Sequence, residues 1–290
     1  MKKSIFLFVV LLTLEACSVL NQSKDDSTDT TALAALVLLN SRTSVAYTLD
    51  TTTGCISGVA TSLDTSLPSW IKDNFKCQTV KVNGSNYVFS VTDLPNHKSY
   101  YYGSTSSLYE ALPSGNRSAG NNTITAQSIT LTIPSSPSSA SSKTATGLST
   151  IGVSVNGVSI FSNDAAPGDT LSSEVATFDK YAGHPQDAGI FHYHAEPTYI
   201  SNSDSSLIGI ALDGYAIYGS KCQQNGTDIT PTISTSSTDT TTTLDTNHGH
   251  TSVTKNFTTA TYHYHLAYDS TATISTLLGD YYHGTPGTSN

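Results

Sequence analysis

Two short segments of the chain repeat the same histidine pattern. Residues 189–197 read GIFHYHAEP and residues 261–269 read TYHYHLAYD, so each segment carries two histidines separated by one tyrosine. Because side chains alternate across a β-strand, two residues at this spacing project from one face, and the aromatic residues beside them project from the other. Each segment therefore predicts a strand that presents two imidazoles side by side, as a metal-chelating pair requires.

Further histidines precede each segment. One lies in AGHPQDAG ahead of the first segment, and DTNHGH supplies two more ahead of the second. Imidazole suits zinc, copper, nickel and iron, whereas the single methionine and scarce cysteines argue against a site dominated by sulfur ligands. We expect the histidines to bind copper or zinc. The candidate metal ligands are His184, His192, His194, His248, His250, His263 and His265.

One strand of this kind supplies only two imidazoles per face. A closed zinc site needs four ligands, and an open catalytic site usually has three protein ligands. We therefore expect the two His-Tyr-His segments to converge on one metal site. A metal ion with an open coordination position could also activate water, so the sequence leaves open whether the protein is an enzyme.

Three carboxylates lie near the histidines in sequence. Asp213 lies in GIALDGYAIYG, where the Asp-Gly pair predicts a tight hairpin turn. In a functional role, Asp213 would accept a hydrogen bond from a ligand histidine or act as an acid or base. The turn and the functional role are compatible with each other. Asp213 is thus the candidate catalytic residue, with Asp187 and Glu196 as further candidates for a base or for fixing histidine tautomers.

A second function class competes with metal binding. The histidines and the 16 tyrosines could form a polar, hydrogen-bonded core without any metal, in a surface binding or adhesion module. Tyrosine-rich surfaces suit contacts with proteins or glycans. Metal analysis separates the two hypotheses.

The order of these motifs resembles the YHYH-domain family. The matching elements run from TATGLSTIGVSVNGVSIFS through FDKYAGHPQDAGIFHYHAEP, LIGIALDGYAIYG, LDTNHGHT and YHYHLAYD to LLGDYYHGTPG, and LPNHKSYYYG extends them over residues 85–287. Phe191 departs from the pattern, because it replaces the first tyrosine of one motif. The resemblance implies that the seven candidate histidines and Asp213 belong to the family pattern, and it assigns them no activity.

The N-terminus predicts export and membrane attachment. Lys2 and Lys3 precede an apolar stretch that is too short to span a bilayer, as in a secretory signal. The following Leu-Glu-Ala-Cys resembles a bacterial lipobox, which would place a lipid on Cys17 and make the lipid bilayer a partner. We expect a signal peptide over residues 1–16, a flexible tether over 17–44, and a lipoprotein in the periplasm or on the cell surface. The net charge of −9 argues against nucleic acid as a partner.

Alternating apolar and polar residues dominate the rest of the chain. Residues 79–91 and 152–162 each alternate on both sides of an Asn-Gly pair, which predicts two β-hairpins, and residues 128–134 alternate again. Residues 67–75 are the best helix candidate. We expect one mainly β domain over residues 45–290, built from antiparallel strands and hairpins with few short helices.

The cysteines fit an exported protein. If Cys17 carries a lipid, three cysteines remain, and the nearest pair in sequence is Cys55 and Cys77. We expect these two to form a disulfide, since the exported setting favours oxidation. Cys222 is then a free thiol, a metal ligand or a small buried side chain.

Overall fold

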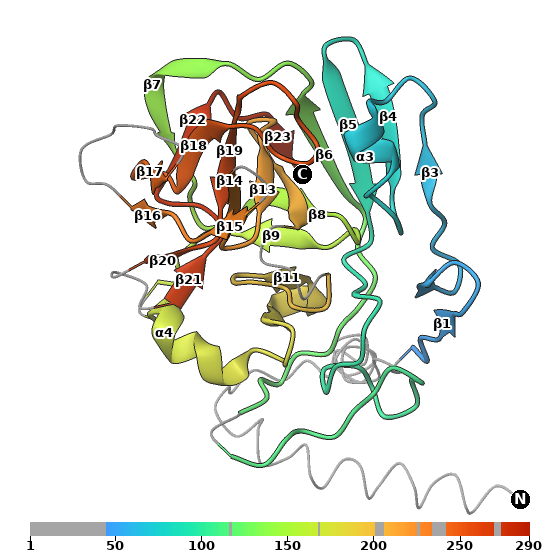
Figure 1. The fold of residues 1–290 in the computed structure, drawn as a ribbon. Coiled ribbons are helices and arrows are strands. Elements are labelled where there is room, and N and C mark those ends of the chain that lie inside the picture. The colour runs from blue at the N-terminus through green and yellow to red at the C-terminus, as the bar shows by residue number, and fades with distance from the viewer. Residues whose placement is uncertain are drawn as a thin grey trace, which may run out of the picture. The chain divides into compact units, whose positions relative to one another are not determined.

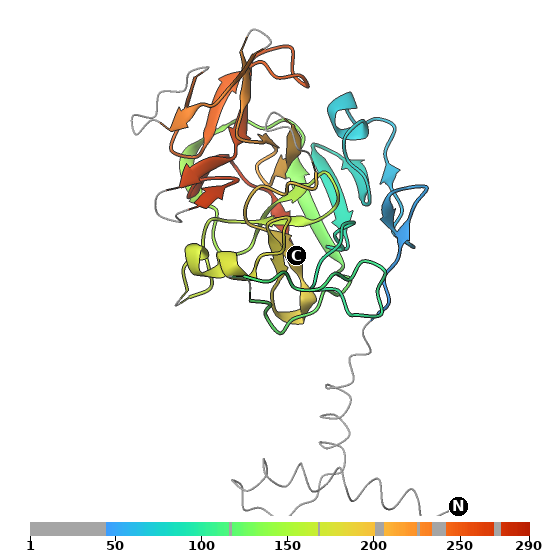
Figure 2. The ribbon, with the colours of Figure 1, turned by 60° about the horizontal axis from the view of Figure 1, so that its bottom comes forward.

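A computed structural model describes residues 45–115, 118–167, 169–200, 206–224, 227–233, 242–269 and 274–290. The expected signal peptide, the lipid-bearing Cys17 and the tether lie outside these residues. Ser44–Asn290 form one compact unit, drawn in Figures 1 and 2. Its described elements are mostly β-strands, which confirms the mainly β fold class. In the same described part of the chain, no helix is long and apolar enough to cross a membrane.

A five-stranded sheet is formed by the N-terminal part of the unit and the last residues of the chain. Its strands, in spatial order, are β23 (Thr288–Ser289), β6 (Ile129–Pro134), β5 (Asn86–Val91), β4 (Thr79–Asn83) and β3 (Ser62–Leu63). The β4–β5 hairpin confirms the Asn-Gly turn expected within residues 79–91. Along β6 the burial alternates with the predicted period of two, and Ile129, Leu131 and Ile133 face the core.

An eight-stranded sheet carries both His-Tyr-His segments. In spatial order it contains β10 (Gly183–Pro185), β11 (Phe191–Tyr193), β9 (Ser159–Phe161), β8 (Thr150–Ser154), β12 (Leu207–Ala211), β13 (Ala216–Tyr218), β19 (Thr261–His265) and β18 (Gly249–Ser252). The sheet is mixed, because β11 pairs with β9 and β13 pairs with β19 in parallel. These parallel pairs were not foreseen, since hairpin signals report only neighbours in sequence.

The eight-stranded sheet consists of two matching halves. In each half a hairpin (β8–β9 or β12–β13) is followed by a second hairpin (β10–β11 or β18–β19), whose later strand pairs in parallel with the first hairpin. The halves meet where β8 and β12 run antiparallel, which relates them by an approximate two-fold axis. At this join Gly152 faces the backbone at Ile210, and Gly209 faces the backbone at Val153, so close that a Cβ on either glycine would clash.

The remaining elements are short. The two-stranded sheets are β1 (Leu49–Asp50) with β2 (Cys55–Ile56), β14 (Cys222–Gln224) with β15 (Thr227–Ile229), β16 (Thr232–Ile233) with β17 (Thr243–Leu244), β20 (Ala267–Asp269) with β21 (Ile274–Thr276), and β22 (Tyr281–Gly284) with β7 (Ser139–Ala145). The described helices are α3 (Ser69–Lys72), α4 (Leu171–Glu174), η1 (Val175–Thr177) and η2 (Asp187–Gly189). The helix expected over residues 67–75 is thus only the four residues of α3.

One apolar core joins the two large sheets. Phe89 and Leu131 of the five-stranded sheet belong to the same buried cluster as Ile151, Ile210 and Ile217 of the eight-stranded sheet. The two sheets accordingly lie side by side in both ribbon views. This shared core holds the strands of the histidine-bearing sheet in a fixed relation to one another.

The predicted disulfide is confirmed. The sulfur atoms of Cys55 and Cys77 are bonded, and the bond closes a loop between residues 22 apart in sequence. Cys222 lies outside this bond and is buried at the start of β14.

Candidate metal centres

The first histidine cluster consists of His184, His192 and His194. The antiparallel register of β10 and β11 places His184 opposite His192. His192 and His194 share one face of the strand, as their spacing predicted, and their Nε2 atoms lie 3.0 Å apart. The three side chains are a group whose ligand atoms could hold a metal ion.

Backbone carbonyls fix the orientation of two of these imidazoles. His192 Nδ1 lies 3.1 Å from Ile190 O, and His194 Nδ1 lies 2.9 Å from Ser162 O. A carbonyl oxygen can only accept, so each Nδ1 carries the hydrogen and donates it. In the neutral ring Nε2 is then an unprotonated acceptor, which is the tautomer that binds a metal through Nε2.

The third imidazole is fixed through a hydroxyl group. Thr177 Oγ1 lies 2.7 Å from His184 Nδ1 and donates its own hydrogen to Glu174 O, also over 2.7 Å. The hydroxyl can therefore only accept from His184, which places the hydrogen on Nδ1 there as well. All three Nε2 atoms of the cluster thus keep their lone pairs.

Burial keeps these rings neutral. It lowers the pKa of His184 to about 3 and that of His194 to about 4, and it lowers the pKa of His192 well below its usual range. The charge of neighbouring histidines lowers the pKa of His184 and His192 further. Near neutral pH the Nε2 lone pairs of His192 and His194 consequently face each other. Two imidazoles on a tetrahedral zinc ion would hold their nitrogens roughly 3.3 Å apart, close to the separation here.

A carboxylate and a cavity adjoin the first cluster. Glu174 Oε2 lies 3.7 Å from His184 Nε2 and 3.9 Å from His194 Nε2. All three histidines and Glu174 line a cavity of about 560 Å³, to which Asp187 also contributes. Glu196 is not among its lining residues. Sequence reasoning missed Glu174, which precedes His184 by ten residues and carries no motif, because only the fold of α4 brings it back to β10 and β11.

The second histidine cluster consists of His250, His263 and His265. It repeats the geometry of the first, since β18 and β19 place His250 opposite His263. His263 Nδ1 donates to Thr261 O over 2.8 Å, and His265 Nδ1 donates to Gly219 O over 2.7 Å. Cys222 Sγ and the ligand atoms of His250 and His265 lie within 4.8 Å of one another, so they too could hold a metal ion.

The prediction that both segments converge on one site is wrong. Four strands separate β11 from β19 in the sheet, which is roughly 24 Å at about 4.8 Å per strand spacing. Figure 1 shows β11 and the β18–β19 pair on opposite sides of β8 and β9. The physical reason is that each segment receives its third imidazole from its own hairpin partner, His184 or His250, and needs no ligand from the other segment.

Two predicted site residues, His248 and Asp213, belong to neither group of converging ligand atoms. His248 is buried with a φ of 68°, and its carbonyl accepts a hydrogen bond from His265 N over 2.8 Å, but neither group of converging ligand atoms includes it. Asp213 Oδ2 accepts hydrogen bonds from Tyr264 Oη over 2.5 Å and from Gly284 N over 2.9 Å. Asp213 thus positions β19 through Tyr264 rather than orienting a ligand histidine directly.

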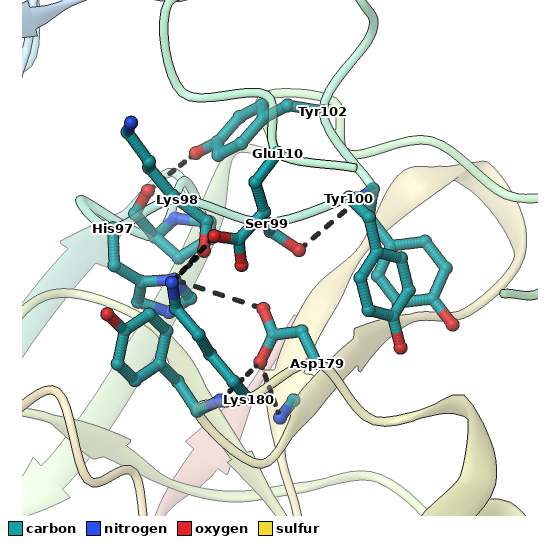
Figure 3. A network of polar contacts seen from close by, with 12 residues as sticks. His97, Lys98, Ser99, Tyr100, Tyr102, Glu110, Asp179 and Lys180 are labelled. Carbon is teal, nitrogen blue, oxygen red and sulfur yellow. Dashed lines mark hydrogen bonds and ion pairs between the residues drawn. The ribbon is translucent and has the colours of Figure 1, made fainter. Parts of the chain in front are cut away.

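A buried polar network supports β11 from behind. Tyr193 Oη lies 3.0 Å from His97 Nε2 and accepts a hydrogen bond from Asn156 Nδ2. His97 Nδ1 lies 3.8 Å from Asp179 Oδ2. Figure 3 marks this contact with a dashed line. Burial lowers the pKa of His97 to about 3 and raises the pKa of Asp179 to about 7, so this contact is not an ion pair between a charged histidine and a carboxylate at neutral pH. In the second half, a buried hydrogen bond from Tyr262 Oη to Asp245 Oδ2 supports β19, and it has no counterpart in the first half because Phe191 occupies the position of Tyr262.

The fold and the two clusters define a class of β protein with a duplicated, histidine-bearing sheet. Residues 130–239 match the family model described as "YHYH protein". They form a YHYH domain, which confirms the expected family over a narrower range than residues 85–287. The matched range includes the first cluster and Asp213 and ends before β18 and β19. In comparisons with curated proteins and with solved structures, nothing matches the chain significantly.

Proposed function

We propose that the protein is an exported, membrane-anchored protein that binds a transition metal ion at His184, His192 and His194. The observation that carries this proposal is the convergence of three neutral imidazoles, each with its Nδ1 hydrogen held by another group of the protein. Their Nε2 lone pairs are left for a shared ligand. The membrane anchor is argued from the N-terminal sequence alone, through Cys17.

A shared cation accounts for the contact between His192 and His194 better than a hydrogen bond does. A hydrogen bond between their Nε2 atoms would need a proton on one of them, in addition to the hydrogen on each Nδ1. That ring would then be a charged imidazolium, and burial of such a charge is unfavourable at this position. A metal ion accepts both lone pairs without adding a proton to either ring.

The surroundings of the cluster favour zinc or copper with one position open to the cavity. Imidazole nitrogens and a carboxylate oxygen suit these metals, and Glu174 could supply the oxygen. The metal would adjoin a cavity large enough for a small substrate, where it could activate water. Asp164, Asp169 and Asp187 also line this cavity and favour a neutral or cationic substrate over an anionic one.

Metal analysis of the protein purified without a histidine tag tests the proposal. The double variant His192→Ala/His194→Ala should lose the metal of the first cluster. The matched control is His263→Ala/His265→Ala, which changes the equivalent pair in the other half and should leave the first cluster loaded. Protein that is metal-free as purified and cannot be loaded with zinc or copper would overturn metal binding. It would favour the alternative of a surface binding or adhesion module with a metal-free polar core.

A further inference from the structure

We propose that Cys222, His250 and His265 form a second and separate metal site, closed to substrate, which takes zinc or copper through thiolate and imidazole ligands. The ligand atoms of these residues lie within 4.8 Å of one another. His263 lies beside them, with its ring centroid 4.8 Å from that of His250 and 4.9 Å from that of His265. This site does not depend on the first cluster being occupied.

A buried ring nitrogen points to a ligand in the second cluster. His265 is 1% exposed, and its Nδ1 donates to Gly219 O. Its Nε2 is buried and has no hydrogen-bond partner in the part of the chain that the structure describes. A buried nitrogen lone pair without a partner is unfavourable, whereas a metal ion bonded to it would satisfy it.

The second site is closed where the first is open. His250, His265 and Cys222 are at most 3% exposed, whereas the side chains of His184 and Glu174 are 14% and 18% exposed. The second cluster adjoins a cavity of only about 10 Å³, which is about the space of a single water molecule. Such a space admits an ion and excludes a substrate, as in structural metal sites.

The two halves differ in the ligand that comes from outside the duplicated strands. In the first half this residue is Glu174 of α4, an oxygen ligand. In the second half it is Cys222 of β14, a sulfur ligand. Because thiolate prefers softer metals than carboxylate does, the same histidine framework is adapted to two different coordination environments.

Charge also bears on the second site. Lys221 and Lys255 line the same small cavity, and their positive charges oppose a cation. Deprotonation of Cys222 would offset part of this repulsion, because the thiolate brings a negative charge directly to the ion. Metal binding would release the thiol proton, as it does in zinc–cysteine sites generally.

Cobalt(II) provides a probe that reports thiolate ligation directly. The full chain would carry Cys17→Ser, so that Cys222 is the only thiol left beside the Cys55–Cys77 disulfide. Loaded with Co²⁺, this parent protein should show a thiolate-to-cobalt charge-transfer absorption. The band should persist in His192→Ala/His194→Ala, with one Co²⁺ fewer per chain, and should disappear in Cys222→Ser.

The outcomes of this experiment distinguish failure of the second site from failure of the first. Absence of the band from the fully loaded parent would overturn the second site, and this measurement needs no substitution at Cys222. Persistence of the band in Cys222→Ser would overturn it as well. A parent that binds one Co²⁺ with the band intact would support the second site while contradicting metal binding at the first cluster. Circular dichroism of each variant checks that the fold is retained.

Discussion

Tyr264 donates a hydrogen bond of 2.5 Å to the buried carboxylate of Asp213. Tyr264 lies between His263 and His265, so this bond ties the rear face of the histidine strand to the turn between β12 and β13. In the first half, Asn156 takes the position of Asp213 and Tyr193 that of Tyr264, and Asn156 Nδ2 donates a hydrogen bond to Tyr193 Oη. In both halves, therefore, the tyrosine of the His-Tyr-His motif anchors the strand while the histidines project from its other face.

Removing this anchor should destabilise the protein. Tyr264→Phe takes one donor from the buried Asp213, whose pKa is already raised by burial, and should lower the free energy of unfolding by about 1–3 kcal/mol. Urea denaturation measures the change. Asp213→Asn keeps an acceptor for Tyr264 and is the matched comparison with the smaller expected loss. An unchanged midpoint for Tyr264→Phe would show that the bond adds nothing to stability.

Metal at the first cluster should resist acidification further than free histidine would. Because burial lowers the pKa of His184 to about 3 and that of His194 to about 4, their Nε2 lone pairs stay unprotonated well below the ordinary pKa of about 6.5. Protons should compete with the metal only as the pH falls through about 4. Equilibrium dialysis against zinc at pH 7, 5 and 3.5 measures this, with circular dichroism at each pH to confirm folding. Half-release near pH 6.5 would contradict it.

The stability of the protein should fall with pH over a higher range than the metal affinity does. The folded pKa values of His184 and His194 lie below the unfolded value, so unfolding takes up protons once the pH is below about 6.5. The stabilising contribution of these neutral rings is present above pH 6.5 and is lost as the pH falls toward 4. Asp179 acts in the other direction between pH 7 and 4, because its pKa is raised to about 7. Because protons do not compete with zinc for the folded protein above about pH 4, urea midpoints with zinc should exceed those without zinc by a nearly constant amount between pH 6.5 and 5, and identical midpoints would count against metal binding.

Glu174 should contribute to metal affinity at the first cluster. Glu174→Gln keeps the size of the side chain and removes its charge, and it should weaken zinc binding there by about 10-fold or more. Calorimetry measures the affinity. Glu110→Gln is the control, because Glu110 pairs with Lys180 in a contact that does not involve the cluster. Equal affinities for the two variants would remove Glu174 from the site.

Membrane attachment should depend on Cys17. If the N-terminal sequence is a lipoprotein signal, Cys17→Ala prevents lipidation and the variant should leave the membrane fraction. Cell fractionation followed by immunoblotting measures this, with Cys222→Ala as a cysteine control that should stay attached. Retention of Cys17→Ala in the membrane fraction would exclude lipid anchoring at this residue.

Local patterns in the sequence predicted local structure well. The paired projection of His192 and His194, the Asn-Gly hairpins and the Cys55–Cys77 bond all depend on residues close together in the chain, and all are present. The spatial order of the strands depends on long-range pairing, which alternation does not encode. That order separates the two clusters, although their repeated motifs suggested a single site.

For the same cause, sequence reasoning missed Glu174 as a candidate ligand and left metal binding by Cys222 as one of three open possibilities. Glu174 reaches the first cluster through the placement of a short helix, and Cys222 reaches the second through the placement of β14. Neither residue has a motif or a periodic position that distinguishes it from other acidic or cysteine residues. Only packing against the sheet shows that Glu174 lies beside His184 and His194, and that Cys222 lies beside His250 and His265.

The antiparallel join of β8 and β12 gives the duplicated sheet the geometry of a symmetric dimer within a single chain. Two equivalent strands that meet antiparallel across a two-fold axis are how identical subunits pair in a symmetric dimer. Here both halves belong to one chain, so the residue beside one cluster can differ from its counterpart beside the other, as Glu174 and Cys222 do.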